Sequence, residues 1–268
     1  MITVGYDPVE YWPPDWNANT KRKIIHIDVL TAALENCYQP YVELTGDIAQ
    51  TLDALTPQIN RSAKSALSAS MLEAIVAERN RLTEESARRG GTPVHPLRLV
   101  HELKQFLSSD VTLCLDMGSF HLWIARHLYS FRPRQVLISN GQQTLGVALP
   151  WGIAATLVRP SEKILSISGD GGFLYSAMEL ATAVQEKLPV VVVVVNDGSL
   201  TLIKAIQHRR YADRFIAVDL HNPDFALLAR AFGVRAWIAD SEATLGTALP
   251  EALSLGEPAL VELRVSGK

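Results

Sequence analysis

Six consecutive valines at positions 190–195 constrain the fold of this chain more than any other stretch. β-branched side chains favour strands, and a strand with no polar residue on either face must be covered on both faces. Pro189 precedes the run and Asn196, Asp197 and Gly198 follow it, so residues typical of turns bound it at both ends. Such a strand is typical of a parallel sheet with a layer of helices on each side.

Shorter apolar strands and helical segments alternate around this run. Further strands are expected at residues 111–115, 135–139, 163–168, 234–238 and 259–265. Helices are expected at residues 96–106, 118–127, 145–157, 178–186 and 224–232, the third interrupted by Pro150. This alternation predicts an α/β fold with a doubly wound parallel sheet, in which ligands bind at the carboxyl ends of the strands.

The first 95 residues have a different pattern. Strands are expected at residues 2–5, 24–28 and 41–44, and a helix at residues 47–55. Three strands with so little helix make a poor independent domain, so residues 1–56 are interpreted as the remnant of a second α/β domain. A charged helical stretch and a Gly-Gly-Thr-Pro sequence predict a connecting helix and linker over residues 57–95. The main domain is expected over residues 96–268.

Composition and charge exclude several functions. A net charge of -3 and a pI near 6.2 provide no general attraction for nucleic acid or an anionic membrane. The sequence does not open on a basic region followed by an apolar stretch, and no apolar run approaches the ~20 residues that span a bilayer. Cys37 and Cys114 lack metal-ligand spacing and are expected to be free thiols in a reducing compartment. The cytoplasm is therefore the expected location.

A second motif follows the strand expected at residues 163–168. Gly169, Gly171 and Gly172 let the backbone turn and approach a ligand closely, and Asp170 projects from the strand end between them. Backbone amides at the start of the next helix favour a bound phosphate. A carboxylate beside a diphosphate requires a divalent cation between them, and Mg²⁺ suits a site with one or two carboxylates and phosphate oxygens.

A second carboxylate is expected at the same edge of the sheet. Asp197 ends the valine strand, and neighbouring parallel strands are about 5 Å apart, so Asp170 and Asp197 can reach one cation. Two carboxylates this close raise each other's proton affinity unless a cation neutralises them. The alternative is that both only cap helices or turns, because Gly-Asp-Gly and Asn-Asp-Gly are common turn sequences. The paired arrangement favours a site for a metal-bound diphosphate.

Together these motifs resemble the signature of thiamine diphosphate-dependent enzymes. The resemblance rests on Pro160, on the apolar strand that ends in residues 169–172, and on the Asn196-Asp197 end of the next strand. It implies that Asp170 and Asp197 bind Mg²⁺ through their side chains and that Ser199 adds its backbone carbonyl. Many members have Asn where this chain has Asp197, and Asn196 is the alternative ligand.

Two further stretches, residues 116–123 and 139–150, resemble the large catalytic subunit of acetolactate synthase, especially the catabolic type. This resemblance implies that the backbone carbonyl of Gln143 contacts the aminopyrimidine of the cofactor. It also implies that Leu145 is an apolar wedge that holds the cofactor bent, with ordinary core packing as the alternative. The implied cofactor-binding residues are Met117, Gly118, Ser119, Gly141, Gln143, Leu145, Gly169, Asp170, Gly171, Gly172 and Asn196, and the implied metal ligands are Asp170, Asp197 and Ser199.

The resemblance covers only the second half of such enzymes, from the end of their middle domain onward. It implies a cytoplasmic dimer that decarboxylates a 2-oxo acid such as pyruvate and joins the remaining two carbons to a second 2-oxo acid, in branched-chain amino acid biosynthesis. The pyrimidine-binding domain, whose glutamate activates the cofactor, has no counterpart in this sequence. No catalytic residue is therefore assigned, and the chain alone is expected to be inactive.

Three functions stay open at this point. The chain is the C-terminal part of an acetolactate synthase-like enzyme, a non-catalytic cofactor-binding or assembly subunit, or half of a 2-oxo acid decarboxylase. The expected partners are a 2-oxo acid substrate, further copies of the chain and a chain that carries the pyrimidine domain, with no nucleic acid and no membrane. Thiamine diphosphate and Mg²⁺ are the expected cofactors, and FAD binding is left open because only a remnant of the middle domain is expected.

Overall fold

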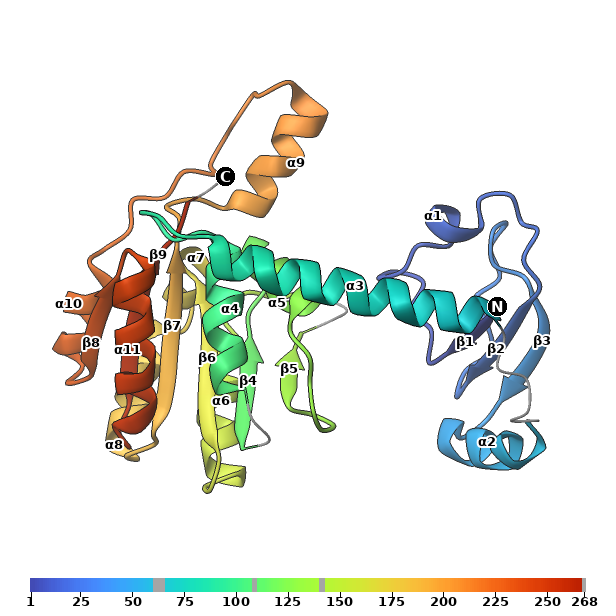
Figure 1. Cartoon of the computed structure of the whole chain (residues 1–268), viewed down its shortest axis with the longest axis horizontal. Coiled ribbons are helices and arrows are strands. Elements are labelled where there is room, and N and C mark those ends of the chain that lie inside the picture. Colours follow the sequence, from blue (N-terminus) through green and yellow to red (C-terminus); the bar gives the residue numbers. More distant parts are fainter. Residues whose placement is uncertain (60–65, 108–109, 140–142, 267–268) are drawn as a thin grey trace. The chain divides into compact units, whose positions relative to one another are not determined.

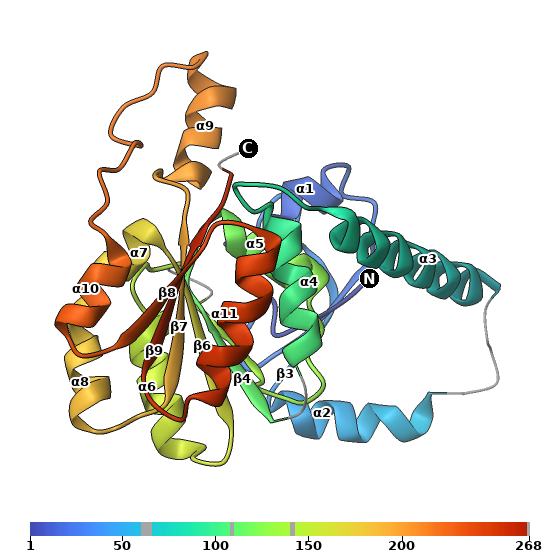
Figure 2. The ribbon, with the colours of Figure 1, turned by 60° about the vertical axis from the view of Figure 1, so that its left-hand side comes forward.

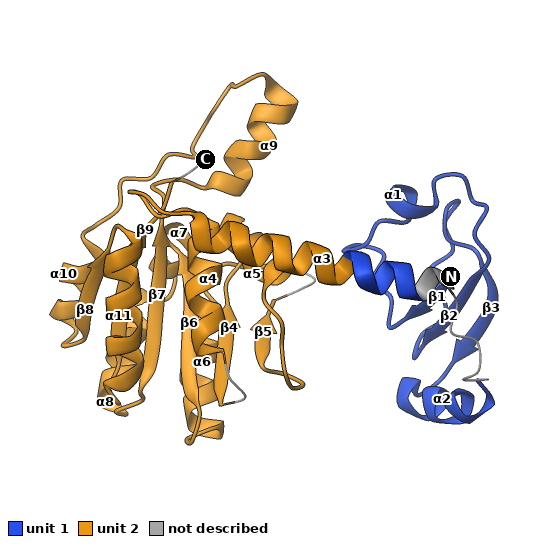
Figure 3. Ribbon diagram, in the orientation of Figure 1, with its two compact units in different colours: residues 1–74 blue, residues 75–268 orange. Residues whose placement is uncertain are grey.

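The computed structural model describes residues 1–59, 66–107, 110–139 and 143–266 (Figure 1). They form two compact units, Met1–Ala74 and Ile75–Lys268, each with its own parallel sheet (Figure 3). The long helix α3 (Ala66–Arg88) contains the boundary between the units. The α/β fold class predicted from the sequence is confirmed.

The first unit is a three-stranded sheet in the order β1-β2-β3. Its strands and helices are β1 (Ile2–Val4), α1 (Pro13–Asn17), β2 (Ile24–Asp28), β3 (Pro40–Thr45), α2 (Ile48–Leu55) and the 3₁₀ helix η1 (Thr56–Gln58). The hydroxyl of the buried Tyr38 lies 2.8 Å from both Thr3 Oγ1 and His26 Nδ1. These polar atoms satisfy one another inside a small core, so their burial costs little.

The second unit is built on a six-stranded parallel sheet in the order β5-β4-β6-β7-β9-β8. Its strands are β4 (Val111–Leu115), β5 (Val136–Ile138), β6 (Lys163–Gly169), β7 (Val190–Asn196), β8 (Arg235–Ala239) and β9 (Ala259–Arg264). Strand β7, which contains the six valines, lies in the interior of this sheet between β6 and β9.

Helices cover both faces of the sheet, as Figures 1 and 2 show. One face carries α4 (Pro96–Phe106), α5 (Ser119–His127) and α11 (Glu242–Ser254). The other face carries α6 (Ala148–Val158), α7 (Asp170–Leu174), η2 (Ala177–Glu179), α8 (Leu180–Gln185) and α10 (Phe225–Ala231). Helix α9 (Thr201–Tyr211) belongs to neither layer and projects beyond the carboxyl ends of the strands.

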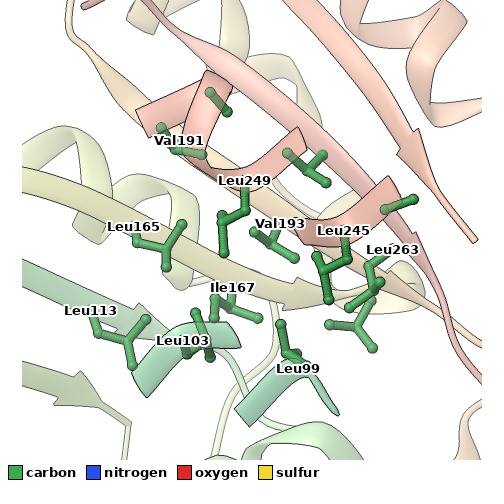
Figure 4. Packing of buried hydrophobic residues seen from close by; sticks show 14 of the residues in the cluster. Leu99, Leu103, Leu113, Leu165, Ile167, Val191, Val193, Leu245, Leu249 and Leu263 are labelled. Atoms are coloured by element: carbon green, nitrogen blue, oxygen red, sulfur yellow. The ribbon is translucent and has the colours of Figure 1, made fainter. Parts of the chain in front are cut away.

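The valines of β7 divide between the two cores. Val191, Val193 and Val195 pack in the core under α4, α5 and α11, and the other three pack in the core on the opposite face. Figure 4 shows Val191 and Val193 in the first core, with the α11 residues Leu245 and Leu249. All six valines are buried, which is the two-sided burial that the sequence predicts.

Prolines account for two differences from the predicted helices. Helix α6 begins at Ala148, so Pro150 lies in its first turn and does not interrupt it. A missing N–H costs no intrahelical hydrogen bond at that position. Helix α11 was not predicted, and it contains Pro250. A capping box between Ser241 and Thr244 begins α11, and its buried leucines hold it on the sheet despite the proline.

Cys37 and Cys114 are both free thiols, as predicted. Cys114 is buried in β4, and burial raises the pKa of its thiol to about 12, so the reactive thiolate is disfavoured. Within the described residues, no helix combines the length and the apolar character that crossing a bilayer requires.

Truncating a core leucine tests this packing. Leu249 is fully buried, so Leu249→Ala leaves a cavity and is expected to lower the free energy of unfolding by about 3 kcal/mol. Urea denaturation followed by tryptophan fluorescence measures the change. Leu227→Ala on α10 removes the same atoms from a side chain that is 62% exposed, and the expected change is below about 0.5 kcal/mol. Equal losses in the two variants would contradict the placement of Leu249 in the core.

Candidate functional site

The candidate site lies where the direction of chain winding reverses. From β4 the chain moves to β5 on one side and then to β6 on the other side of β4. In an open parallel sheet this reversal leaves a crevice outside the carboxyl ends of the neighbouring strands β4 and β6. Strand β7 pairs with β6 so that Val195 lies opposite Gly169. The residues that follow β7 therefore reach the same edge.

A cavity of about 310 Å³ lies at this edge of the sheet. Segments that follow β4, β5, β6 and β7 form its walls. Its lining contains the predicted residues Met117, Gly118, Ser119, Gln143, Leu145, Gly169, Asp170, Gly171, Gly172, Asp197 and Ser199, together with Phe120, Val195, Leu200, Thr201, Leu202 and Ile203. Segments that the sequence singled out separately thus meet around one space.

Two of the predicted residues are not in this lining. The side chain of Asn196 bonds to other protein groups instead: its Nδ2 donates to Glu262 Oε1 at 3.0 Å and its Oδ1 accepts from Asn222 Nδ2 at 3.0 Å. Gly141 lies outside the described residues. The roles assigned to these two residues stay predictions.

The segment that contains α9 supplies the wall that the sequence did not predict. Leu200 N donates to Val218 O at 2.7 Å, and Leu220 N donates to Gly198 O at 2.8 Å. The segment therefore leaves the sheet and returns to it at one point. Leu202 and Ile203 in the first turn of α9 line the cavity. Their apolar character directly after the Asp197 turn was the available signal in the sequence.

Asp170 accepts three hydrogen bonds at the edge of the cavity. Its side chain is buried at the first position of α7. Oδ1 accepts from Gly171 N at 2.8 Å, and Oδ2 accepts from Gly198 N at 2.8 Å and from Asn222 Nδ2 at 2.6 Å. Hydrogen bonds to a carboxylate are stronger than those between neutral groups. Asp170 thus ties the turn after β7 and the segment before α10 to the end of β6.

Asp197 faces the same cavity from the turn after β7. Its Oδ1 accepts from Ser199 N at 3.1 Å, and its Oδ2 accepts from Thr201 Oγ1 at 2.6 Å. Burial raises the pKa of Asp197 above its usual value, and the nearby Asp170 raises it further, against the effect of these hydrogen bonds. A cation between the two carboxylates would remove this penalty.

The cavity holds negative charge without a basic side chain. Asp170 and Asp197 are the charged residues in its described lining, which contains no Lys, Arg or His. In the part of the chain that the structure describes, no three His, Cys, Asp or Glu side chains form a cluster that could hold a metal ion alone. A cation bound by two carboxylates needs further oxygens, and Mg²⁺ commonly takes them from phosphate and water. The donor set fits a magnesium-bound phosphate ligand.

Asp116 fixes the backbone directly after Leu145, which lines the cavity. It is completely buried at the end of β4 and accepts from Gly146 N at 2.9 Å and Val147 N at 3.2 Å. Burial raises the pKa of Asp116, and the two backbone hydrogen bonds oppose that effect. A Cβ on Gly172 would lie 2.7 Å from Asp116 Oδ2, so this close approach requires glycine. Asp116 directly follows the strand predicted at residues 111–115, but the sequence analysis assigned it no role.

Residues 116–263 match the family described as thiamine pyrophosphate enzyme, C-terminal TPP binding domain. The match covers more than half of the chain and contains the whole cavity lining. The chain belongs to this family. The matched residues begin directly after β4 and include β5 to β8, most of β9 and the cavity at the carboxyl ends of β4 and β6.

Several curated relatives of this chain are acetolactate synthases. The chain is 45% identical to the catabolic acetolactate synthase of Raoultella terrigena over 99% of its own length and 47% of the relative. It is 39% identical to the acetolactate synthase of Bacillus subtilis (strain 168) over 99% of its length and 46% of the relative. It is 27% identical to the large subunit of acetolactate synthase isozyme 2 of Escherichia coli (strain K12) over 90% of its length and 43% of the relative. The chain thus spans about half the length of the curated relatives that it matches.

The raised pKa of Asp197 predicts how the stability of the ligand-free chain depends on pH. A carboxyl whose pKa is higher in the folded than in the unfolded state disfavours folding once it ionises, so the penalty is present at neutral pH and fades as the pH falls through the raised pKa. Asp197→Asn is therefore expected to raise Tm at pH 7 and to lose this advantage towards pH 4. Thr201 can still bond to the amide, since a hydroxyl both donates and accepts.

Thermal unfolding in a buffer free of divalent cations, between pH 4 and pH 7.5, measures this difference in Tm. Glu257→Gln removes an exposed carboxylate outside the cavity and serves as the control, with the same Tm as the wild type at each pH. A lower Tm for Asp197→Asn at pH 7 would contradict the prediction.

Proposed function

We propose that this chain binds thiamine diphosphate together with Mg²⁺ and forms the diphosphate-binding half of an acetolactate synthase-like active site. The carrying observation is a cavity at the winding reversal of the sheet that holds two carboxylates and, among its described residues, no basic side chain. A diphosphate is accepted there only if a cation neutralises both it and the carboxylates. The membership of the chain in the TPP-binding family gives this ligand its identity.

Each wall of the cavity has a role in this proposal. The side chains of Asp170 and Asp197 and the carbonyl of Ser199 hold Mg²⁺, with Asn196 as the alternative ligand. Gly118, Ser119, Gly169, Gly171 and Gly172 lie beside the diphosphate. Met117, Gln143 and Leu145 contact the rings, and Gly141, which lies outside the described residues, is a further proposed cofactor-binding residue.

The proposed reaction is the decarboxylation of a 2-oxo acid such as pyruvate and the transfer of the remaining two carbons to a second 2-oxo acid. Bound thiamine diphosphate supplies a carbon nucleophile and an acceptor for the electrons left when carbon dioxide departs. The chain supplies position and environment: Asp170 and Asp197 fix the charged end through the cation. The apolar side chains of Met117, Leu145 and Leu202 keep water from the other end.

The proposal assigns the activating carboxylic acid to another part of the active site. No glutamate occurs in the described lining of the cavity. The activating acid thus comes from outside this cavity.

In this proposal residues 1–56 are the end of a middle domain, and residues 57–95 are a connecting helix and linker. Residues 96–268 are the cofactor-binding domain of a dimeric enzyme. A pyrimidine-binding domain with the activating glutamate completes the site from a partner chain or another segment.

Calorimetric titration of the chain with thiamine diphosphate in the presence of Mg²⁺ tests cofactor binding. The wild type is expected to bind, and Asp170→Ala is expected to bind at least about 10-fold more weakly because it removes a metal ligand. Asp219→Ala removes a largely exposed aspartate outside the cavity and is the matched control, with wild-type affinity. Undiminished binding by Asp170→Ala would refute the metal assignment.

Release of carbon dioxide from pyruvate tests the assignment of the activating acid. The isolated chain, supplied with thiamine diphosphate and Mg²⁺, is expected to release none. Co-expression with the N-terminal half of the Raoultella terrigena relative is expected to restore release. Turnover by the isolated chain would show that the glutamate is dispensable. Cofactor binding without turnover in either preparation would favour the non-catalytic subunit.

A further inference from the structure

Glu262, a buried residue of β9, does not line the cavity and has no role in the proposed function. Glu262 is 2% exposed, and its Oε1 accepts from Asn196 Nδ2 at 3.0 Å and from Arg264 Nε at 3.1 Å. Its Oε2 is buried without a hydrogen-bond partner among the described residues. A buried carboxylate with one unsatisfied oxygen costs stability. The ion pair with the half-exposed Arg264 offsets part of this cost but leaves Oε2 without a partner among the described residues.

Glu262 supports one orientation of the Asn196 amide. A carboxylate only accepts hydrogen bonds, so Asn196 must turn its NH₂ group towards Glu262. Its oxygen then faces the opposite way. There Oδ1 accepts from Gly198 N at 3.2 Å and from Asn222 Nδ2 at 3.0 Å. Glu262 on β9 and Gly198 N in the turn after β7 thus hold the amide of Asn196 in one and the same orientation.

The same constraint passes from Asn196 to Asn222. Because Asn196 presents an oxygen, Asn222 must present its NH₂ group, and that group also donates to Asp170 Oδ2 at 2.6 Å. The oxygen of Asn222 is buried without a partner in the described part of the chain. The orientation of this amide therefore follows from the two acceptors that its NH₂ group serves. A chain of hydrogen bonds runs from Glu262 through both asparagines to Asp170.

We propose that Glu262 is a positioning residue that, through Asn196 and Asn222, holds Asp170 in the orientation in which it binds the cation. This inference rests on the proposed function, because it needs Asp170 to be a cation ligand. Asp170 Oδ2 receives donors from Asn222 and from Gly198 N, so the carboxylate is fixed before a cation arrives. Partners that orient a metal ligand commonly change metal affinity by about 10- to 100-fold.

Replacing Glu262 by Gln keeps the shape of the side chain and removes its charge. A glutamine oxygen can still accept from Asn196 Nδ2, but a hydrogen bond to a neutral acceptor is weaker than one to a carboxylate, so Asn196 and, through it, Asn222 are held less firmly. Asn222→Ala removes the last donor of the chain instead. If Glu262 acts through Asn222, the double variant loses no more affinity than Asn222→Ala alone. Independent structural damage at the two positions would add.

The experiment titrates Mn²⁺ into the full chain at saturating thiamine diphosphate and follows free Mn²⁺ by electron paramagnetic resonance. Glu262→Gln and Asn222→Ala are each expected to weaken Mn²⁺ binding by about 10- to 100-fold and to alter the spectrum of the bound ion. Ser166→Ala removes a buried hydroxyl without a partner among the described residues, from the middle of β6. This control is expected to bind like the wild type.

The outcomes separate the two proposals. If the wild type binds and Glu262→Gln binds equally well, or if the two losses add in the double variant, the positioning role is overturned and the proposed function stands. If the wild type does not bind Mn²⁺ with thiamine diphosphate, the proposed function falls and this inference falls with it. Thermal unfolding without ligand confirms that each variant folds. If Glu262→Gln does not fold, Asn222→Ala alone decides, because the side chain of Asn222 is only half-buried. Mn²⁺ binding by Asn222→Ala that equals that of the wild type then overturns the inference.

Discussion

The burial of β7 on both faces is the constraint on which the rest of the second unit depends. Alternate valines of this strand anchor one helical layer each, so neither layer can move without exposing half of the strand. The register of β7 against β6 places Val195 opposite Gly169. That register brings Asp170 and Asp197 to one edge. A packing requirement in the interior therefore determines where two charges meet at the rim of the sheet.

Local sequence was enough to predict the strands of the sheet and the polar edge of the cavity, because each of these signals spans only a few residues, whereas the walls at Met117, Gln143 and Leu145 were implied by the family resemblance. The valine run, the glycines around Asp170 and the turn at Asp197 report strand ends without knowledge of the rest of the chain. Asn222 and Glu262 lie 52 and 66 residues from their partners Asp170 and Asn196, and no local pattern marks such contacts. Helix α11 was missed because Pro250 argues against it locally, whereas its packing on the sheet decides.

Electrostatics links the affinity of the site to the stability of the fold. Burial raises the pKa of Asp197 and of Asp116, so the chain retains carboxylates where their charge is unfavourable. Hydrogen bonds from Gly146 N and Val147 N offset part of the free-energy cost of ionised Asp116. Asp197 instead faces the cavity, where a cation can reach it. In the proposed function the cation removes the remaining penalty at Asp197. Ligand binding would then stabilise the folded chain by a free energy that grows with the logarithm of the ratio of ligand concentration to Kd.

The segment that contains α9 begins and ends at one point of the sheet, where Gly198 and Leu200 bond to Leu220 and Val218. A loop closed at its base can change in length and sequence without shifting β7 or α10, because loop closure depends only weakly on loop length. The apolar wall that α9 contributes can therefore change while the hydrogen bonds of Asp170 are kept. Exchange of the part of this segment that follows Thr201 offers a route to reshape the space beside the anchor while Asp170 and Asp197 keep their hydrogen bonds.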